Sequence, residues 1–347
     1  MQPALKGSVR IFSAIALTSL AGIIFSTTTF AQEQASGRRM SMVVASGPGG
    51  GYDIYSRTLA RHYGKYLPGT PAIAVQNMPG GGGNVAANYL YNIAPRDGSA
   101  IGMLQSVSFL VAALGEKSAQ FLNSKFSLIG NMNEETDTCI LWHTSKIADA
   151  KAFLTQEVII GGAGLGSTSI SFPMGMNNIL SSKLKIIPGY HGAANERVVA
   201  MERGELQGAC GVFLSTVKSQ LAGQLRDAKI RIVLQMGLSR HPDLADVPNA
   251  LEFATSASGR NALEFLFAQL AFGRPILAPP GVPTQWLSAA QTGFEKTMQD
   301  LEYLAEAKKL NLETRWFGAS RMADVMGRID SVDEPVKATV RTLLNIQ

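Results

Sequence analysis

The stretch "SGPGGGYD" (residues 46–53) follows a short apolar segment and precedes a segment with helical periodicity. A second cluster of the same kind, "NMPGGGGN" (residues 77–84), stands in the same setting further along the chain. Glycine lets the backbone turn through positive φ and lets a ligand approach the main chain, but it costs conformational entropy on folding. Two such loops therefore indicate that the exposed main chain of these segments has a function.

Strands and helices are predicted to alternate around these loops. "MSMVVA" is a predicted strand before the first loop, residues 52–67 a helix after it, residues 72–78 a second strand and residues 84–94 a second helix. This alternation is typical of a mainly parallel sheet covered on both faces. Both loops then lie at the carboxyl ends of strands, where open α/β sheets bind ligands beside helix N-termini.

The same pattern restarts in the second half of the chain. "DTCILWH" (137–143), "EVIIGGAG" (157–164) and "IRIVLQMG" (230–237) are predicted strands, whereas the apolar run at 263–272 fits neither a helix nor a strand clearly. A third glycine loop, "GGAGLGSTS" (161–169), runs into a predicted helix whose first turn carries two hydroxyl side chains. The chain therefore predicts a second α/β unit with its own loop at a helix start.

Three ligands could explain the glycine loops. A phosphate loop needs Lys and Ser or Thr after its last glycine, but Tyr52–Asp53 and Asn84–Val85 stand there. The spacing of a dinucleotide loop is not kept either. A carboxylate held by main-chain N–H groups at helix N-termini needs no cationic side chain and fits best. Tight turns without a ligand remain the alternative.

The N-terminal region has the layout of an export signal. Lys6 and Arg10 precede an uncharged apolar run at residues 11–25, and small residues, Thr29 and Ala31, follow it. This layout predicts a cleaved signal peptide at residues 1–31. A membrane anchor is the alternative, but the apolar run is short for crossing a bilayer.

Composition excludes some classes of partner and leaves the state of the cysteines open. The formal charge is +5, and it falls to +3 without Lys6 and Arg10; no stripe of basic and aromatic residues predicts binding to nucleic acid. An exported protein could join Cys139 and Cys210 in a disulfide, or both thiols could be buried and free.

Motifs for catalysis and metal binding are absent from the sequence. No G-x-S-x-G segment occurs, so the nucleophile turn of the hydrolase fold is missing. The four histidines, at 62, 143, 191 and 241, lack the spacing of metal ligands. We therefore expect no catalytic residue, no metal and no cofactor, and a protein that is not an enzyme.

Six ordered blocks together carry a resemblance to one family. In chain order they are "GPGGGYD", "QNMPGGGGNVAANYLYNIAPRDGSAIGML", "GGAGLGSTS", "GYHGAANERVVAMERGELQG", "IRIVLQMGLSRHPDLADVPNALEF" and "LAPPGVPTQWL". In this order the blocks resemble the Bug family, the extracytoplasmic solute receptors of tripartite tricarboxylate transporters. The resemblance covers nearly the whole chain after the signal peptide.

The resemblance implies an α/β fold of the two-lobed type II periplasmic binding protein class, each lobe a mainly parallel sheet flanked by helices, with the ligand in the cleft between the lobes. We expect lobe 1 at residues 38–141 plus 232–347 and lobe 2 at 142–231, with the strands "DTCILWH" and "IRIVLQMG" as the hinge. Pro48, Gly49, Gly50 and Asp53 match the family's first loop, but Ser46 and Gly47 depart from it. Gly164, Gly166 and Ser167 match the loop of the second lobe.

The resemblance further implies a monomeric periplasmic receptor that binds a small organic acid and delivers it to integral membrane transporter subunits. The alternatives are a ligand sensor for a two-component system and a periplasmic enzyme on the same scaffold. The residues expected to contact the ligand come from both lobes. They are Ser46, Gly49, Gly50, Tyr52, Asp53, Gln105, Ser106, Gly164, Gly166, Ser167, Thr168, Tyr190 and Phe213.

Overall fold

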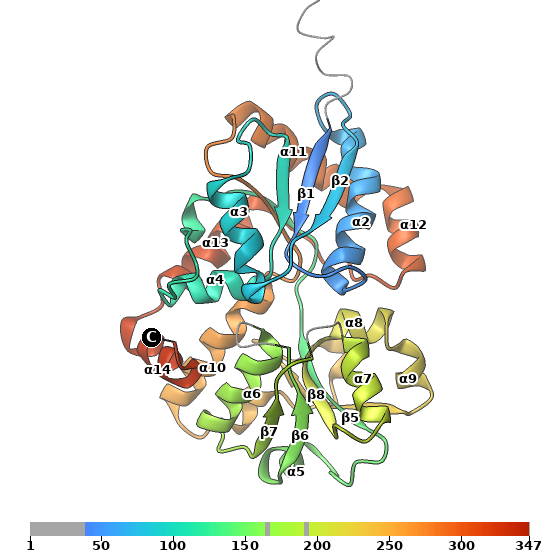
Figure 1. Ribbon diagram of the computed structural model, residues 1–347, viewed down its shortest axis with the longest axis vertical. Helices are drawn as coiled ribbons and strands as arrows, with labels where there is room; N and C mark the ends of the chain where they lie inside the picture. The colour runs from blue at the N-terminus through green and yellow to red at the C-terminus, as the bar shows by residue number, and fades with distance from the viewer. Residues whose placement is uncertain (1–38, 164–166, 191–193, 347) are drawn as a thin grey trace, which may run out of the picture.

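The structure, a computed structural model, describes residues 39–163, 167–190 and 194–346. These residues form two lobes, each built on one β-sheet, stacked along the long axis of the molecule (Figure 1). None of the helices in the described ranges has both the length and the apolar character that crossing a membrane requires. The predicted signal peptide lies outside the described residues.

The sheet of the first lobe has six strands in the order β11-β4-β10-β3-β1-β2. β1 pairs in parallel with β2 and β3, whereas β10 and β11 run antiparallel to their neighbours. The strands are β1 (Met40–Val44), β2 (Ile73–Asn77), β3 (Ala100–Met103), β4 (Ser127–Asn131), β10 (Pro275–Ala278) and β11 (Phe317–Gly318).

The internal strand β1 is mostly apolar because both of its faces are covered. Met42 and Val44 pack on one side of the sheet, and Val43, which points the other way, packs on the opposite side. α2, α11 and α12 cover the first side, and α3, α4 and α13 lie on the second (Figure 1). These helices are α2 (Gly51–Tyr63), α3 (Asn84–Asn92), α4 (Ser106–Ala113), α11 (Thr284–Met298), α12 (Leu301–Lys309) and α13 (Ala319–Asp330).

The sheet of the second lobe has five strands in the order β7-β6-β8-β5-β9. β6 pairs in parallel with β7 and β8, whereas β5 runs antiparallel to β8 and β9. Cys139 and Ile140 of β5 face opposite sides of this sheet and join different core clusters. The strands are β5 (Asp137–Trp142), β6 (Val158–Gly161), β7 (Leu184–Ile187), β8 (Gly208–Phe213) and β9 (Ile230–Met236).

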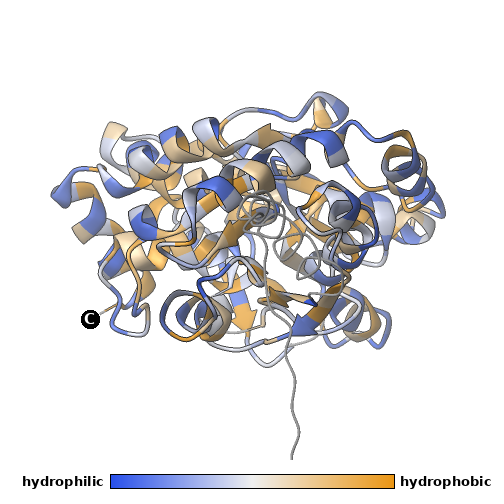
Figure 2. Ribbon diagram, turned by 90° about the horizontal axis from the view of Figure 1, so that it is seen from above, coloured by the Kyte–Doolittle hydropathy of each residue, from blue (hydrophilic) through white to orange (hydrophobic). Residues whose placement is uncertain are grey.

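Helices from two distant parts of the chain cover the second sheet. α10 and α14 come from the C-terminal part of the chain and pack on α6 (Figure 1). In Figure 2 hydrophobic colour gathers in the middle of the molecule and hydrophilic colour on its outer turns. The helices are α5 (Ala150–Thr155), α6 (Thr168–Ile179), α7 (Ala194–Glu202), α8 (Leu214–Ser219), α9 (Ala222–Arg226), α10 (Ala257–Ala268) and α14 (Glu334–Leu344).

The chain passes between the lobes at residues 132–136, 269–274 and 331–333. The first two passages run side by side, since Gly273 N–H donates to Asn133 O at 3.0 Å and Glu135 N–H donates to Leu270 O at 2.9 Å. The third passage joins α13, which packs on β4, to α14, which packs on α6.

The two-lobed α/β architecture expected from the sequence is observed, with differences in detail. Both sheets are mixed rather than mainly parallel, because β10 and β5 enter their sheets straight after a passage and run in the reverse direction. The expected lobe boundaries at 141/142 and 231/232 fall inside β5 and β9, and both strands pair within the second sheet. The apolar run at 263–272 is the end of α10 and a 3₁₀ turn.

Candidate functional site

A cavity of about 1130 Å³ lies where the two lobes face each other. The first lobe contributes the segments that follow β1, β2 and β3, and the second contributes the starts of α6 and α7 and the end of β8. Lining residues from the first lobe include Ser46, Gly50, Gly51, Tyr52, Pro79, Gly80, Gly82, Asn84, Gln105 and Ser106. Lining residues from the second lobe and the passages include Ala163, Ser167, Thr168, Ser169, Arg197, Gly211, Phe213, Thr216 and Arg274.

The first glycine loop is held in shape by a buried carboxylate. Asp53 accepts hydrogen bonds from Gly49 N–H at 2.9 Å, Asn77 Nδ2 at 2.8 Å and Arg57 Nε at 3.0 Å. Burial alone would raise the pKa of Asp53, but the hydrogen bonds from Arg57, Gly49 and Asn77 outweigh it and hold the pKa below its usual range. Asp53 thus fixes the backbone of Gly49, whose φ is +77°, and α2 starts with its N-terminus at the cavity.

The second glycine loop turns the chain from β2 into α3. Gly80, Gly81, Gly82 and Gly83 all have positive φ, which L side chains rarely adopt. At Gly83 a Cβ would lie 2.9 Å from both Gln105 Cβ and Ser108 Oγ, so this glycine also allows close packing on α4. The loop lines the cavity, although the prediction from sequence selected none of its residues as ligand contacts.

The N-terminus of α4 is the third helix start of the first lobe at the cavity. Gln105 is its N-cap and donates from its side chain to the carbonyl of Ala45, directly before the first glycine loop. Ser106 N–H points at Tyr52 Oη at 3.3 Å, so the phenol of α2 and the start of α4 are in contact. The two helices are thereby fixed relative to each other at the cavity wall.

The second lobe presents the N-terminus of α6. Ser167 is its N-cap, and Thr168 begins the helix. Ser169 Oγ accepts from Ala163 N–H at 2.9 Å and lies 2.7 Å from Ser167 Oγ, so the hydroxyls organise the turn that enters the helix. The first turn of a helix carries N–H groups without helical acceptors and the positive end of the dipole, both of which favour an anion.

Two buried titratable side chains, Arg197 and Asp137, lie behind this helix start. Arg197 lines the cavity and donates to the carbonyls of Cys210 at 2.6 Å and Gly211 at 3.2 Å. Burial lowers the pKa of Arg197 to about 10, although the nearby Asp137 carboxyl acts against it. Burial likewise raises the pKa of Asp137 to about 7, against hydrogen bonds from the Thr168 hydroxyl and the Thr138 N–H.

Arg197 and Arg274, two arginines that line the cavity, were not among the residues predicted from sequence. The position of Arg274 could have been recognised in the sequence, because it is the one charged residue between Glu264 and Glu295. A lone charge in so long an uncharged stretch indicates a buried and partnered side chain. Arg197 could not have been recognised in this way, since charged residues surround it on its helix.

The structure brings most of the predicted ligand contacts to one place. Asp53, Gly49 and Tyr190 are not among the residues that line the cavity, and Gly164 and Gly166 lie outside the described residues. The contacts themselves stay a prediction. The predicted residues that line the cavity are Ser46, Gly50, Tyr52, Gln105, Ser106, Ser167, Thr168 and Phe213.

The two cysteines form a disulfide between Cys139 of β5 and Cys210 of β8, with both side chains fully buried. Of the alternatives left open by the sequence, the structure therefore has the disulfide. Because β8 ends in Gly211, Val212 and Phe213, the bond lies directly behind the part of the sheet that lines the cavity.

Two groups of histidine and carboxylate side chains lie close enough together to be considered as metal sites in the described ranges. They are His62 with Asp300 and Glu302, and His241 with Asp243 and Glu313. In each group a lysine ammonium already bonds both carboxylates, Lys65 in the first and Lys218 in the second. These lysines supply the positive charge that the carboxylates need, and both groups are apart from the residues that line the cavity.

Comparison with models of known protein families finds no match. Comparison with curated proteins finds none either.

Solved structures do resemble this chain. The periplasmic binding protein BugD is 19% identical, with a TM-score of 0.69 over 89% of this chain and 98% of its own. MatC from Rhodopseudomonas palustris, with bound malate, is 19% identical, with a TM-score of 0.66 over 86% and 99%. A TctC solute binding protein from Polaromonas, without ligand, is 18% identical, with a TM-score of 0.61 over 89% and 98%. The predicted two-lobed α/β fold of periplasmic binding proteins is therefore confirmed.

Proposed function

We propose that this protein is a periplasmic solute receptor of the tripartite tricarboxylate transporter type, which captures a small organic carboxylate between its lobes and delivers it to membrane transporter subunits. The observation that carries the proposal is the convergence of helix N-termini from both lobes, α2, α4 and α6, on one cavity. Main-chain N–H groups and helix dipoles at such positions bind anions.

The likeness in fold supports the proposal, and so do the six sequence blocks. MatC has malate bound, and malate is a carboxylate of the proposed class. The remaining parts of the proposal are the export of the chain by a signal peptide at residues 1–31, a monomeric receptor and the absence of catalysis.

Capture would proceed by closure of the lobes. The acid first binds the helix starts of one lobe, and the other lobe then closes on it, because the closed form gains contacts that the open form lacks. We place the hinge at residues 132–136 and 269–274, where hydrogen bonds hold two passages side by side, rather than within β5 and β9. A bend in these short passages leaves both sheets intact.

The proposal is tested on the protein exported with its own leader and purified from the periplasm. Isothermal titration calorimetry with acetate, succinate, citrate and benzoate is expected to give saturable binding of at least one acid at one site. Small-angle scattering of that complex is expected to show a more compact particle. If no acid binds at millimolar concentration, the proposed function is wrong.

A further inference from the structure

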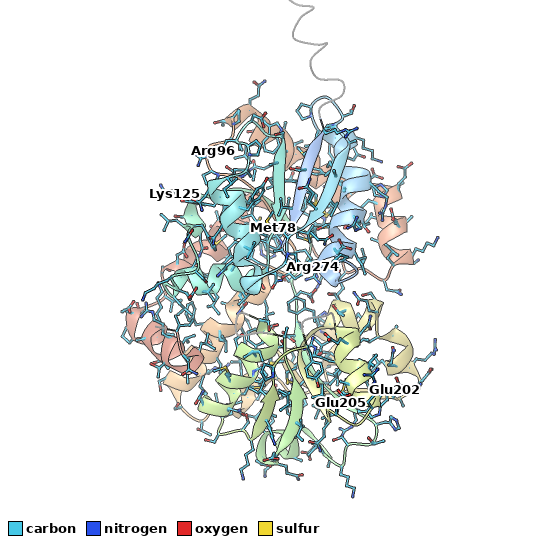
Figure 3. The ribbon with its side chains drawn as sticks, viewed as in Figure 1. Met78, Arg96, Lys125, Glu202, Glu205 and Arg274 are labelled. Atoms are coloured by element: carbon cyan, nitrogen blue, oxygen red, sulfur yellow. A yellow bond between two sulfur atoms is a disulfide. The ribbon has the colours of Figure 1, made fainter. Side chains whose placement is uncertain are left out.

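Arg274 lies in the passage that leads into β10, between the two lobes (Figure 3). Its side chain is almost fully buried, yet it belongs to the cavity lining. A buried guanidinium is costly unless its charge and its donors are matched, so its surroundings show what it is prepared to bind.

Aromatic rings from both lobes surround this cation. Its guanidinium carbon lies 4.4 Å from the ring centre of Tyr52 and 4.7 Å from that of Tyr55, both on α2. The ring of Phe213, at the end of β8, is 5.2 Å away. Rings at these distances attract a cation and keep water away from it. Arg274 is therefore poorly hydrated at the edge of the cavity.

The polar partners of Arg274 leave part of its capacity unused. Nη1 donates to Gly273 O at 2.6 Å, and Nη2 lies 3.2 Å from both Ser215 Oγ and a carboxylate oxygen of Glu135. Nε is buried and has no hydrogen-bond partner in the described part of the chain, and the same holds for Oε2 of Glu135. Both members of the pair are thus only partly satisfied.

The guanidinium points at the N-terminus of α2. A Cβ on Gly51, the first residue of that helix, would lie 2.8 Å from Nη2, so a side chain at this position would displace the guanidinium. The N-cap, Gly50, offers no side chain to the first turn of this 13-residue helix. The free N–H groups of the helix start and the cation therefore face the same part of the cavity, which Gly51, Tyr52 and Thr216 also line.

We propose that Arg274 and the N-terminus of α2 form an anion subsite that takes a carboxylate group of the ligand, and that Glu135 is the internal counter-ion with which this carboxylate competes. The inference rests on the proposed function and assigns a specificity-determining residue to it. Main-chain N–H groups alone also donate hydrogen bonds to neutral oxygen atoms, whereas a dehydrated arginine distinguishes a carboxylate from its amide.

The pair gives a test in which two substitutions act in opposite directions. Arg274→Gln removes the charge and is expected to weaken carboxylate binding at least about tenfold, the usual worth of a hydrogen bond to a charged group. Glu135→Gln removes the competing charge, keeps the size of the side chain and is expected to tighten binding. Burial, the largest influence on the pKa of Glu135, raises it, whereas the neighbouring Arg274 guanidinium favours the charged carboxylate and acts against burial.

The measurement is calorimetric titration with acetate, succinate, citrate and benzoate, and with the primary amide of whichever binds most tightly. Arg203→Gln, on an exposed arginine of the second lobe, is the matched control and is expected to bind like the unaltered protein. The amide is expected to bind the unaltered protein at least about tenfold more weakly than the acid and to gain nothing from Glu135→Gln.

Weaker binding in both variants would show that the pair is merely structural and would overturn the inference. Should Arg274→Gln fail to fold, Glu135→Gln and the comparison of acid with amide decide alone. Equal binding of acid and amide would overturn the subsite while leaving a working receptor. An unaltered protein that binds no acid would overturn the proposed function, and the subsite with it.

Discussion

Among the glycines of the described ranges, Gly211 combines a positive φ with a very close approach to backbone atoms, so a single methyl group there is expected to be costly. It lies in β8 with φ at +69°, and its carbonyl accepts from Arg197. A Cβ there would lie 2.3 Å from the N and Cα atoms of Ser169, in the first turn of α6. Gly211→Ala therefore imposes a left-handed conformation on an L residue and drives an atom into helix backbone that cannot rotate away.

The expected loss of unfolding free energy is the sum of two costs. The left-handed conformation costs about 1–2 kcal/mol for a residue with a side chain. Overpacking of a filled interior costs about 1–3 kcal/mol more. Gly211→Ala is thus expected to lower the free energy of unfolding by about 2–5 kcal/mol. Because the displaced turn is the start of α6, the affinity for carboxylate should fall as well.

Two other glycines separate these costs. Gly204 has φ at +77° and open space around it, so Gly204→Ala should lower the free energy of unfolding only by the cost of the backbone conformation. Gly327 lies in α13 with open space and no positive φ, so Gly327→Ala should stabilise the protein slightly. Urea unfolding of the three variants measures the differences. If Gly211→Ala and Gly204→Ala lose the same free energy, the contact between β8 and α6 is not as tight as described, and the reasoning is refuted.

Thr168→Pro removes an N–H group at the first position of α6, where proline fits a helix, and should weaken carboxylate binding about tenfold. Thr168→Val removes only the hydroxyl and should weaken binding less. Equal affinities of the two variants would contradict the role of the N–H group. Asp53→Ala leaves three donors without their acceptor and should lower the free energy of unfolding, measured with urea, by about 1–3 kcal/mol. The affinity for carboxylate should also fall, although Asp53 does not line the cavity. An unchanged affinity would mean that the loop keeps its shape without Asp53. Asp137 has a pKa raised to about 7 in the folded protein, against 3.8 as its ordinary value, so the folded state binds more protons between these values and stability should fall as pH rises from about 4 to about 7. Asp137→Asn should flatten this fall in urea unfolding at a series of pH values, and identical profiles would show that Asp137 is ionised throughout.

Much of the site could be predicted because its elements are local. Runs of glycine before helical periodicity marked the loops at residues 46–53 and 77–84, and the two hydroxyls at residues 167–168 marked a helix start. Each of these features depends on the φ that a few neighbouring residues can adopt and on the N–H groups that any helix start leaves free. The structure has helices starting at Gly51, Asn84 and Thr168 accordingly.

Other features were set by contacts between distant parts of the chain. The pairing of Arg274 with Glu135, the disulfide of Cys139 with Cys210 and the packing of α14 on α6 each join residues whose nearness no local pattern encodes. The loop network has the same origin, since Asp53 accepts hydrogen bonds from Gly49 in its own loop and from Asn77 at the end of β2.

The sequence by itself determined which segments become strands, which become helices and where bare backbone is exposed at their junctions, because periodicity and glycine content act over a few residues. Tertiary structure alone decided that three of these junctions meet across one cavity and that two arginines stand beside them. The physical reason is that burial of both faces of each sheet fixes how the lobes are built. The lobes then bring charged residues that are far apart in sequence together in the interior, where each charge needs a partner.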